Sequence, residues 1–217
     1  KQTEEPQINC LPVGIPRFNK VFTPDISNHS WCLKEPHSKN SLYLRTLSKF
    51  LIGDPSAGRC DSSNQGCGLN KLLPYDENLR MGGDDWPPLG FTMIGMKRMY
   101  NLWAAVDEVI RNEVPGSIVE LGVWRGGAMM MAKAIIKHYK ETRDVYLFDL
   151  FGTISLYGKQ ESFLAVPEER VKQGFKYYEL LDDKVHFVKG LFKDTLPKFN
   201  NTDIIDKIAV LRIDGNY

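Results

Sequence analysis

The sequence of 217 residues lacks both a long apolar run and an excess of charge of either sign. It holds 28 basic and 27 acidic residues, which gives a formal net charge of +1 at pH 7. This balance provides no broad basic surface, so neither a nucleic acid nor an anionic membrane is expected as a partner. No stretch reaches the roughly 18 apolar residues that a bilayer span needs. The sequence opens on Lys-Gln-Thr-Glu-Glu-Pro, which does not resemble a signal peptide, although a processed chain would not show one.

Cysteine is also scarce, and all four cysteines lie in the first third of the chain: Cys10, Cys32, Cys60 and Cys67. An even number in a region rich in Gly, Ser, Asn and Pro favours two disulfides, and four cysteines allow three pairings. A Cys60–Cys67 bond would close a short loop, and a Cys10–Cys32 bond would tie the preceding segment. Zinc binding and free thiols are the alternatives, although no Cys-x-x-Cys pair occurs.

Two glycosylation sequons, Asn28-His-Ser and Asn200-Asn-Thr, add to the case for an oxidising compartment. With the cysteines, they favour the secretory pathway or an extracellular location, and the cytoplasm is the alternative.

The chain divides in character near residue 84. Residues 1–83 show no sustained periodicity and are expected to form an irregular cysteine-bearing extension. A short amphipathic helix from Leu42 to Ile52 is the exception. Its apolar face is expected to hold Leu42, Leu44, Leu47, Phe50 and Leu51.

Residues 84–217 alternate between helical and strand patterns. Helices are predicted over residues 92–112, with Thr92 as the cap, and over 128–139 and 167–181. Apolar strands are predicted over 117–121, 145–149, 184–188 and 208–214. Such an alternation predicts an α/β domain with a mostly parallel sheet covered by helices on both faces.

Polar and glycine residues fall where these strands end: Glu120, Gly122, Asp149, Gly190 and Asp214. Ligands of parallel sheets bind at the carboxyl ends of the strands. Glycines there let the backbone turn sharply, and the following helix directs its amides and positive dipole end toward an anion. An acid that ends the second strand can bind a ribose diol. The pattern predicts a nucleoside ligand with an anionic tail.

The glycine spacing distinguishes between two such ligands. The run Gly122-Val-Trp-Arg-Gly-Gly is not the G-x-G-x-x-G of dinucleotide sites, and Trp124 and Arg125 add bulk where a pyrophosphate needs bare backbone. Glu120 would repel a pyrophosphate but can accept a hydrogen bond from an ammonium group. These features favour S-adenosylmethionine, and a nicotinamide-linked dehydrogenase is the alternative.

Four ordered blocks of residues 84–217 resemble the macrocin O-methyltransferase (TylF-like) family of antibiotic-sugar methyltransferases. They are Asp85-Trp-Pro-Pro-Leu-Gly-Phe-Thr-Met-Ile-Gly, Val114-Pro-Gly-Ser-Ile-Val-Glu-Leu-Gly-Val-Trp-Arg-Gly-Gly, Leu181-Asp-Asp-Lys-Val-His-Phe-Val-Lys-Gly-Leu-Phe-Lys-Asp-Thr-Leu-Pro and Ala209-Val-Leu-Arg-Ile-Asp-Gly. The resemblance implies a Rossmann-like class I methyltransferase fold. It also implies S-adenosylmethionine as cofactor, Mg²⁺ as metal, and a small-molecule hydroxyl acceptor such as a sugar.

The resemblance further implies roles for single residues. The motif that holds the methionine moiety matches Glu120, Gly122, Trp124, Arg125 and Gly126. Asp149 matches the ribose acid, and Gly190 lies in the segment beside the adenine. Asp214 matches an aspartate that binds the metal and acts near the substrate hydroxyl.

Three departures from the family pattern affect the expected activity. Leu150 replaces a small polar residue after Asp149, and Asn216 stands where a second aspartate is common. The family's remaining metal ligands and later strands follow the position of Tyr217, so we expect a sheet that is incomplete at its carboxyl end. A second copy or a protein partner that completes the sheet is therefore expected. The alternative function is a catalytically inactive, secreted, methyltransferase-like interaction module.

Overall fold

The structure is a computed structural model that describes residues 36–53, 55, 58–60, 67, 71–156, 159–199 and 205–215. The predictions for Cys10, Cys32, Asn28, Asn200 and Asn216 fall outside these residues.

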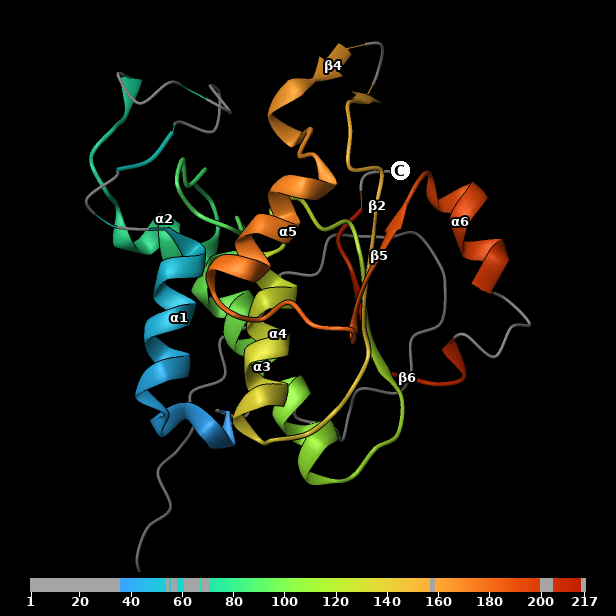
Figure 1. The fold of residues 1–217 in the computed structure, drawn as a ribbon. Helices are drawn as coiled ribbons and strands as arrows, with labels where there is room; N and C mark the ends of the chain where they lie inside the picture. The colour runs from blue at the N-terminus through green and yellow to red at the C-terminus, as the bar shows by residue number, and fades with distance from the viewer. Residues whose placement is uncertain are drawn as a thin grey trace, which may run out of the picture.

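A parallel sheet of four strands forms the centre of the molecule (Figure 1). Its strands are β1 (Ser117–Leu121), β2 (Val145–Asp149), β5 (Val185–Lys189) and β6 (Ile208–Ile213). Their spatial order is β5-β2-β1-β6, and each neighbouring pair is parallel. The predicted α/β class and all four predicted strands are confirmed, with ends within one residue of those expected.

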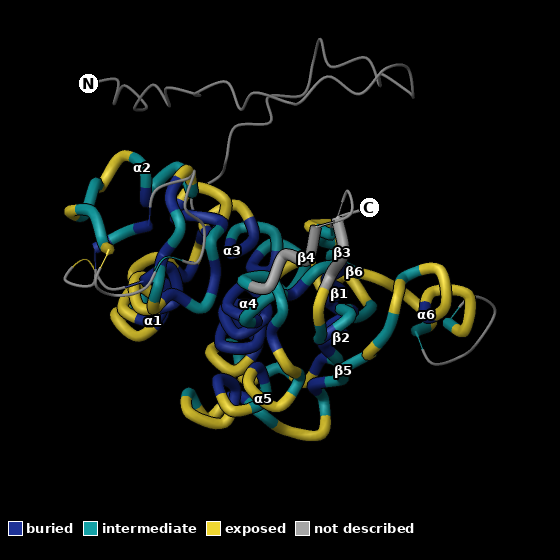
Figure 2. The backbone as a smooth tube through the Cα atoms, turned by 90° about the horizontal axis from the view of Figure 1, so that it is seen from above, coloured by how far each residue is buried: buried dark blue, intermediate teal, exposed yellow. Residues whose placement is uncertain are grey.

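Helices cover both faces of the sheet (Figures 1 and 2). One face carries α1 (Leu42–Ile52), α3 (Gly95–Arg111), α4 (Gly127–His138) and α5 (Glu168–Tyr177), which share one apolar core with the sheet. The methionines 129–131 of α4 are fully buried in it. The other face carries α6 (Phe192–Phe199), which packs against Val119, Leu121, Tyr146 and Phe148. Alternate residues of β1, β2 and β5 enter the two cores because strand side chains alternate in direction.

Several predicted helix details are wrong. The helix expected from Thr92 begins at Gly95, and its N-cap is Ile94, with no side-chain cap. Thr92 Oγ1 instead accepts a hydrogen bond from the Ile94 amide at 3.4 Å. The helix expected to reach residue 181 ends at Tyr177.

The buried face of α1 is narrower than the predicted apolar face. Leu44, Leu47 and Leu51 are buried, whereas Leu42 and Phe50 are 72% and 54% exposed. At 100° per residue, Leu42 and Phe50 lie well over 90° from the line of Leu44 and Leu51. The buried stripe therefore follows the helical period more strictly than the predicted one did.

Short elements escaped prediction altogether. They are η2 (His37–Asn40), α2 (Glu77–Gly82), the hairpin of β3 (Ile154–Leu156) and β4 (Lys159–Glu161), η5 (Ser162–Leu164) and α6. Most are too short to show a period. Pro197 lies inside α6, and a proline at an interior position argues against a helix in the sequence.

The segment predicted to be irregular contributes to the main core. Leu44, Leu47 and Leu51 of α1 join the same apolar cluster as α3 and α4. Next to them, Ser38 binds the fully buried Asp107 of α3 through its amide at 2.9 Å and its hydroxyl at 2.8 Å. The boundary at residue 84 stays a prediction, but the described residues on its two sides share one core.

The Cys60–Cys67 disulfide is present. The Cys60 amide donates to the Trp86 carbonyl at 3.0 Å, and this hydrogen bond links the disulfide to the segment that leads into α3.

Strand β6 forms one edge of the described sheet. Ile208, Leu211 and Ile213 of this strand are about half exposed, at 48%, 50% and 56%. Among the described helices, none is both long and apolar enough to cross a membrane.

Candidate functional site

A cavity of about 830 Å³ opens at the carboxyl ends of the strands. This volume suits a small-molecule or cofactor site. Of the predicted site residues, the cavity is lined by Glu120, Gly122, Trp124, Asp149, Gly190 and Asp214. The structure thus brings together six residues that the sequence separates by up to 94 positions.

Glu120 is the buried acid of this cavity. Its side chain is 1% exposed, and one carboxylate oxygen pairs with Arg212 of β6. The other oxygen, Oε2, is buried and has no hydrogen-bond partner among the described residues. Burial raises the pKa of Glu120 to about 7, against the opposing effect of Arg212. A buried carboxylate oxygen without a donor is costly for the fold, which makes it a strong candidate for a ligand contact.

Arg212 is a charged residue of the cavity that the sequence did not predict as part of the site. It stands directly beside Glu120 in the β1–β6 register, and it also donates to Asp214 Oδ2 at 2.7 Å. The only signal in the sequence is that residue 212 is the one charged position before Asp214 in an otherwise apolar predicted strand.

Gly122 is required by a close approach between β1 and β6. Its φ is +90°, and an added Cβ would lie 2.4 Å from the Asp214 carbonyl oxygen. The Asp214 amide also donates to the Leu121 carbonyl at 2.8 Å. The predicted turn glycine therefore fixes the backbone of Asp214 beside the end of β1. The Asp214 side chain is 47% exposed.

Asp149 holds the turn after β1 in shape. Its Oδ2 accepts from the amides of Val123 at 2.7 Å and Trp124 at 3.2 Å, and its Oδ1 accepts from Phe151 at 2.8 Å. Trp124 and Phe151 both have positive φ, at 49° and 48°, which is strained for these residue types. The carboxylate thus stabilises two strained residues and keeps about one further acceptor site for a ligand. Its ribose contact stays a prediction.

Aromatic residues form one wall of the cavity. The Trp124 indole donates to the Phe163 carbonyl at 3.1 Å, and the ring of Phe163 meets that of Trp86 edge to face at 4.9 Å. Leu150, which departs from the family pattern, also lines the cavity.

Arg125 and Gly126 are predicted cofactor residues that do not line the cavity. Arg125 Nη1 donates at 2.8 Å to the carbonyls of both Pro88 and Gly90, and its guanidinium lies over the Trp124 ring at 4.2 Å. Gly126 packs against Val171 of α5. Their cofactor role stays a prediction, and the contacts observed are with the protein itself.

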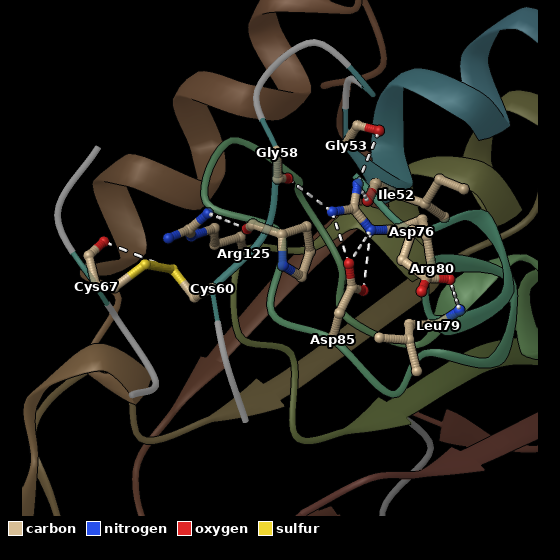
Figure 3. A network of polar contacts seen from close by, with 11 residues as sticks. Ile52, Gly53, Gly58, Cys60, Cys67, Asp76, Leu79, Arg80, Asp85 and Arg125 are labelled. Carbon is tan, nitrogen blue, oxygen red and sulfur yellow. Dashed lines mark hydrogen bonds and ion pairs between the residues drawn. A yellow bond between two sulfur atoms is a disulfide. The ribbon is translucent and has the colours of Figure 1, made fainter. Parts of the chain in front are cut away.

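Residues 83–86, which follow α2, supply another wall of the cavity, called the N-terminal wall below. Buried Arg80 of α2 anchors this wall (Figure 3). Arg80 Nε donates to both oxygens of Asp85 at 2.9 Å, and both side chains are 1% exposed. The remaining guanidinium nitrogens donate to the carbonyls of Ile52, Gly53 and Gly58 at 3.0–3.3 Å. This network holds Asp85 and Trp86 at the edge of the cavity.

The helix end that faces the cavity differs from the expected one. The sequence predicted that the amino end of α4 would meet an anion, but the Gly127 amide donates to the Phe91 carbonyl at 2.9 Å. Instead Thr92, Met93 and Ile94, at the amino end of α3, line the cavity together with Arg98. The positive end of a helix dipole still faces the site, from a different helix.

Gly190 connects β5 to the same edge of the sheet. Its φ is +141°, and its amide donates to the Asp149 carbonyl at 2.9 Å. Leu191 and Phe192, which follow it, line the cavity as well. The segment predicted to lie beside an adenine is thus next to the predicted ribose acid.

These residues fit S-adenosylmethionine better than they fit a metal. Oε2 of Glu120, which has no donor among the described residues, suits the cofactor's ammonium, and Gly122 lines the cavity beside it. For magnesium, the described residues contain no group of three His, Cys, Asp or Glu placed to bind one ion. Asp214 already pairs with Arg212, and one carboxylate is fewer than a magnesium site uses.

A parallel sheet of this order, with helices on both faces and this site at its carboxyl edge, defines a Rossmann-like methyltransferase fold. The chain belongs to the macrocin O-methyltransferase (TylF) family, which it matches over residues 60–217.

Similar proteins agree with this assignment. The chain is 41% identical over 197 residues to demethyldecarbamoylnovobiocin O-methyltransferase of Streptomyces niveus, covering 84% of this chain and 72% of that protein. It is 35% identical over 201 residues to mycinamicin III 3''-O-methyltransferase of Micromonospora griseorubida, covering 83% and 74%. The solved structure of the O-methyltransferase NovP is 39% identical, with a TM-score of 0.67 over 81% of this chain and 72% of NovP.

Proposed function

We propose that this protein is an S-adenosylmethionine-dependent O-methyltransferase that acts on a hydroxyl of a sugar or another small metabolite. Family membership supports O-methyl transfer, and the relatives named above are O-methyltransferases of demethyldecarbamoylnovobiocin and of mycinamicin III. The observation that carries the cofactor assignment is the buried, unpaired Oε2 of Glu120 in a cavity of cofactor size.

In this proposal Glu120 accepts a hydrogen bond from the cofactor's ammonium. The amino end of α3 and Arg98 line the same cavity and favour the carboxylate of the same tail. Asp149 shapes the turn after β1 and receives the ribose, while Gly190 and Leu191 border the adenine.

When bound, S-adenosylmethionine would supply an electrophilic methyl group carried on a positively charged sulfur. The protein must position the hydroxyl and take up its proton. Asp214 is the candidate for that task, since it is half exposed at the cavity and is an acceptor held in place by Arg212.

Magnesium assistance is a further part of the proposal that the described residues support only through Asp214, as a single oxygen ligand. Activity that is lost in EDTA and restored by added Mg²⁺ would support it.

Isothermal calorimetry with S-adenosylmethionine and S-adenosylhomocysteine tests the cofactor assignment, and we expect micromolar affinity for both. Transfer of radiolabelled methyl to a panel of deoxysugar glycosides, including the demethylated acceptors of the relatives, tests the reaction. Absence of binding by the folded protein would rule the proposal out.

Cofactor binding without methyl transfer to any acceptor would favour the alternative, a non-catalytic secreted module. The Cys60–Cys67 bond supports the proposed secretory location. Intact masses of the native protein before and after reduction test that location through its disulfides and through glycan at Asn28.

A further inference from the structure

Arg212 joins two carboxylates that come from different parts of the site. It donates through Nη1 to Glu120 at the end of β1 and through Nη2 to Asp214 just beyond β6. The side chain is only 16% exposed, so it is held in the wall of the cavity. No other cation forms an ion pair with Glu120 among the described residues.

The two oxygens of Glu120 are in different situations. Oε1 is bound by Arg212, which fixes the plane of the carboxylate. Oε2 is buried and has no donor in the described part of the chain, on a residue that lines the cavity. A ligand cation that enters the cavity therefore meets a carboxylate whose orientation has already been set by the protein.

We propose that Arg212 is a positioning residue for the cofactor's amino-acid tail, acting through Glu120, and this inference rests on the function proposed above. The positive charge of Arg212 opposes the effect of burial on the Glu120 carboxylate, and its hydrogen bond to Oε1 directs the other oxygen toward the ligand's ammonium. Because the same guanidinium binds Asp214, the tail contact and the candidate proton acceptor are held by one planar group.

Binding both Glu120 and Asp214 favours the planar, multi-donor guanidinium of arginine over the single ammonium of lysine. A guanidinium offers several donors in a rigid plane and can bridge two carboxylates at once. A lysine at position 212 would keep one positive charge beside Glu120, but its single ammonium is less able to hold both acids.

The test compares two ligands that differ in the tail. S-adenosylhomocysteine carries the ammonium and carboxylate, whereas 5′-methylthioadenosine has the same adenosine and thioether without them. The ratio of their dissociation constants measures tail recognition. Calorimetry on the full chain gives this ratio for the wild type, Arg212→Met, Arg212→Lys and the control Arg143→Met.

Arg143 is a matched control because it is also buried and ion-paired, but at the opposite end of β1. It pairs with Glu141 and donates to the carbonyls of Val114 and Gly116. We expect Arg212→Met to lower the tail-recognition ratio about tenfold or more, with methylthioadenosine affinity nearly unchanged, as for loss of a charged hydrogen bond. Arg212→Lys, which keeps the charge but not the planar set of donors, should recover only part of the ratio, and Arg143→Met should leave it within about twofold of the wild type even if it lowers stability.

The outcomes separate the two proposals. A wild type that binds neither ligand would overturn the proposed function, and this inference with it. A wild type that prefers S-adenosylhomocysteine, with an unchanged ratio in Arg212→Met, would overturn the inference alone. If Arg212→Met does not fold, Arg212→Gln replaces it, since glutamine keeps hydrogen-bond donors but removes the charge.

Discussion

Two arginines that pair with acids, the buried Arg80 and the partly buried Arg212, differ in how completely the hydrogen bonds of their networks are satisfied. Arg80 and Asp85 use both carboxylate oxygens, and three backbone carbonyls complete the guanidinium. Arg212 is shared between Glu120 and Asp214, and one oxygen of Glu120 has no partner among the described residues.

This difference indicates a structural role for the Arg80 network and a ligand-binding role for the Arg212 network. A closed network of charges inside a protein fixes the positions of chain segments, and here it fixes the N-terminal wall of the cavity. An open network leaves a donor or acceptor for something that is not part of the chain. Breaking Arg80 should therefore affect folding, whereas breaking Glu120 should affect binding.

The largest effect is expected for Arg80→Met. Removing one partner of a buried ion pair leaves Asp85 and three carbonyls without donors, and the free energy of unfolding should fall by about 3–5 kcal/mol. Urea denaturation followed by circular dichroism measures it. Arg45→Met, on the exposed side of α1, is the control and should change stability by less than about 0.5 kcal/mol. A small loss in Arg80→Met would show that the closed network is not structural.

Glu120→Gln should produce the reverse pattern. The neutral amide cannot pair with an ammonium as a carboxylate does, so affinity for S-adenosylhomocysteine should fall about tenfold or more. The free energy of unfolding should change far less than in Arg80→Met, because an incompletely paired buried charge is removed. Calorimetry and urea denaturation on the same sample give both quantities. Unchanged affinity would contradict the assignment of Glu120.

The pH dependence of ligand affinity and of stability should both report on Glu120 of the Arg212 network. Since the pKa of Glu120 is raised to about 7, its ionised form accumulates as pH rises through 7, and affinity for S-adenosylhomocysteine should increase between pH 6 and pH 8. For folding the sign is opposite. The folded protein keeps this proton up to about pH 7 whereas the unfolded chain loses it near 4.5, so this group lowers stability as pH rises across that interval. Glu120→Gln should remove both trends, and trends that persist in it would assign them to another group.

The smallest change in stability and affinity is expected for Arg125→Lys, because Arg125 belongs to neither the Arg80 network nor the Arg212 network. Lysine loses the double contact with the Pro88 and Gly90 carbonyls, and the free energy of unfolding should fall by about 1–2 kcal/mol. Cofactor affinity should change less than about threefold. A loss as large as that of Glu120→Gln would instead support the direct cofactor contact that the sequence predicted.

The sheet and its acidic ends were predictable because apolar runs between helical patterns have few other structural explanations. Glu120, Asp149 and Asp214 stand at those ends, and their convergence follows from parallel pairing alone. The N-terminal wall was not predictable in this way. The segment around α2 is short, and its order depends on Arg80 meeting carbonyls 22–28 positions away.

Arg212 shows a different reason for a missed residue. Its importance comes from lateral register, since it is the β6 residue that stands beside Glu120, and register is not set by one strand's own sequence. The predicted roles of Arg125 and Gly126 came from a motif that fixes the turn, and the same motif also serves packing. Motif membership alone does not separate these two uses.

The pairing of β1 with β6 also determines when the site can come into existence. Glu120 and Arg212 are 92 positions apart, so at 5–20 residues per second a ribosome needs roughly 5–20 s to supply the second after the first. During that interval β1, β2 and α4 can assemble around an acid that has no counter-ion. The site is therefore completed only when β6 pairs with β1 and brings Arg212 beside Glu120.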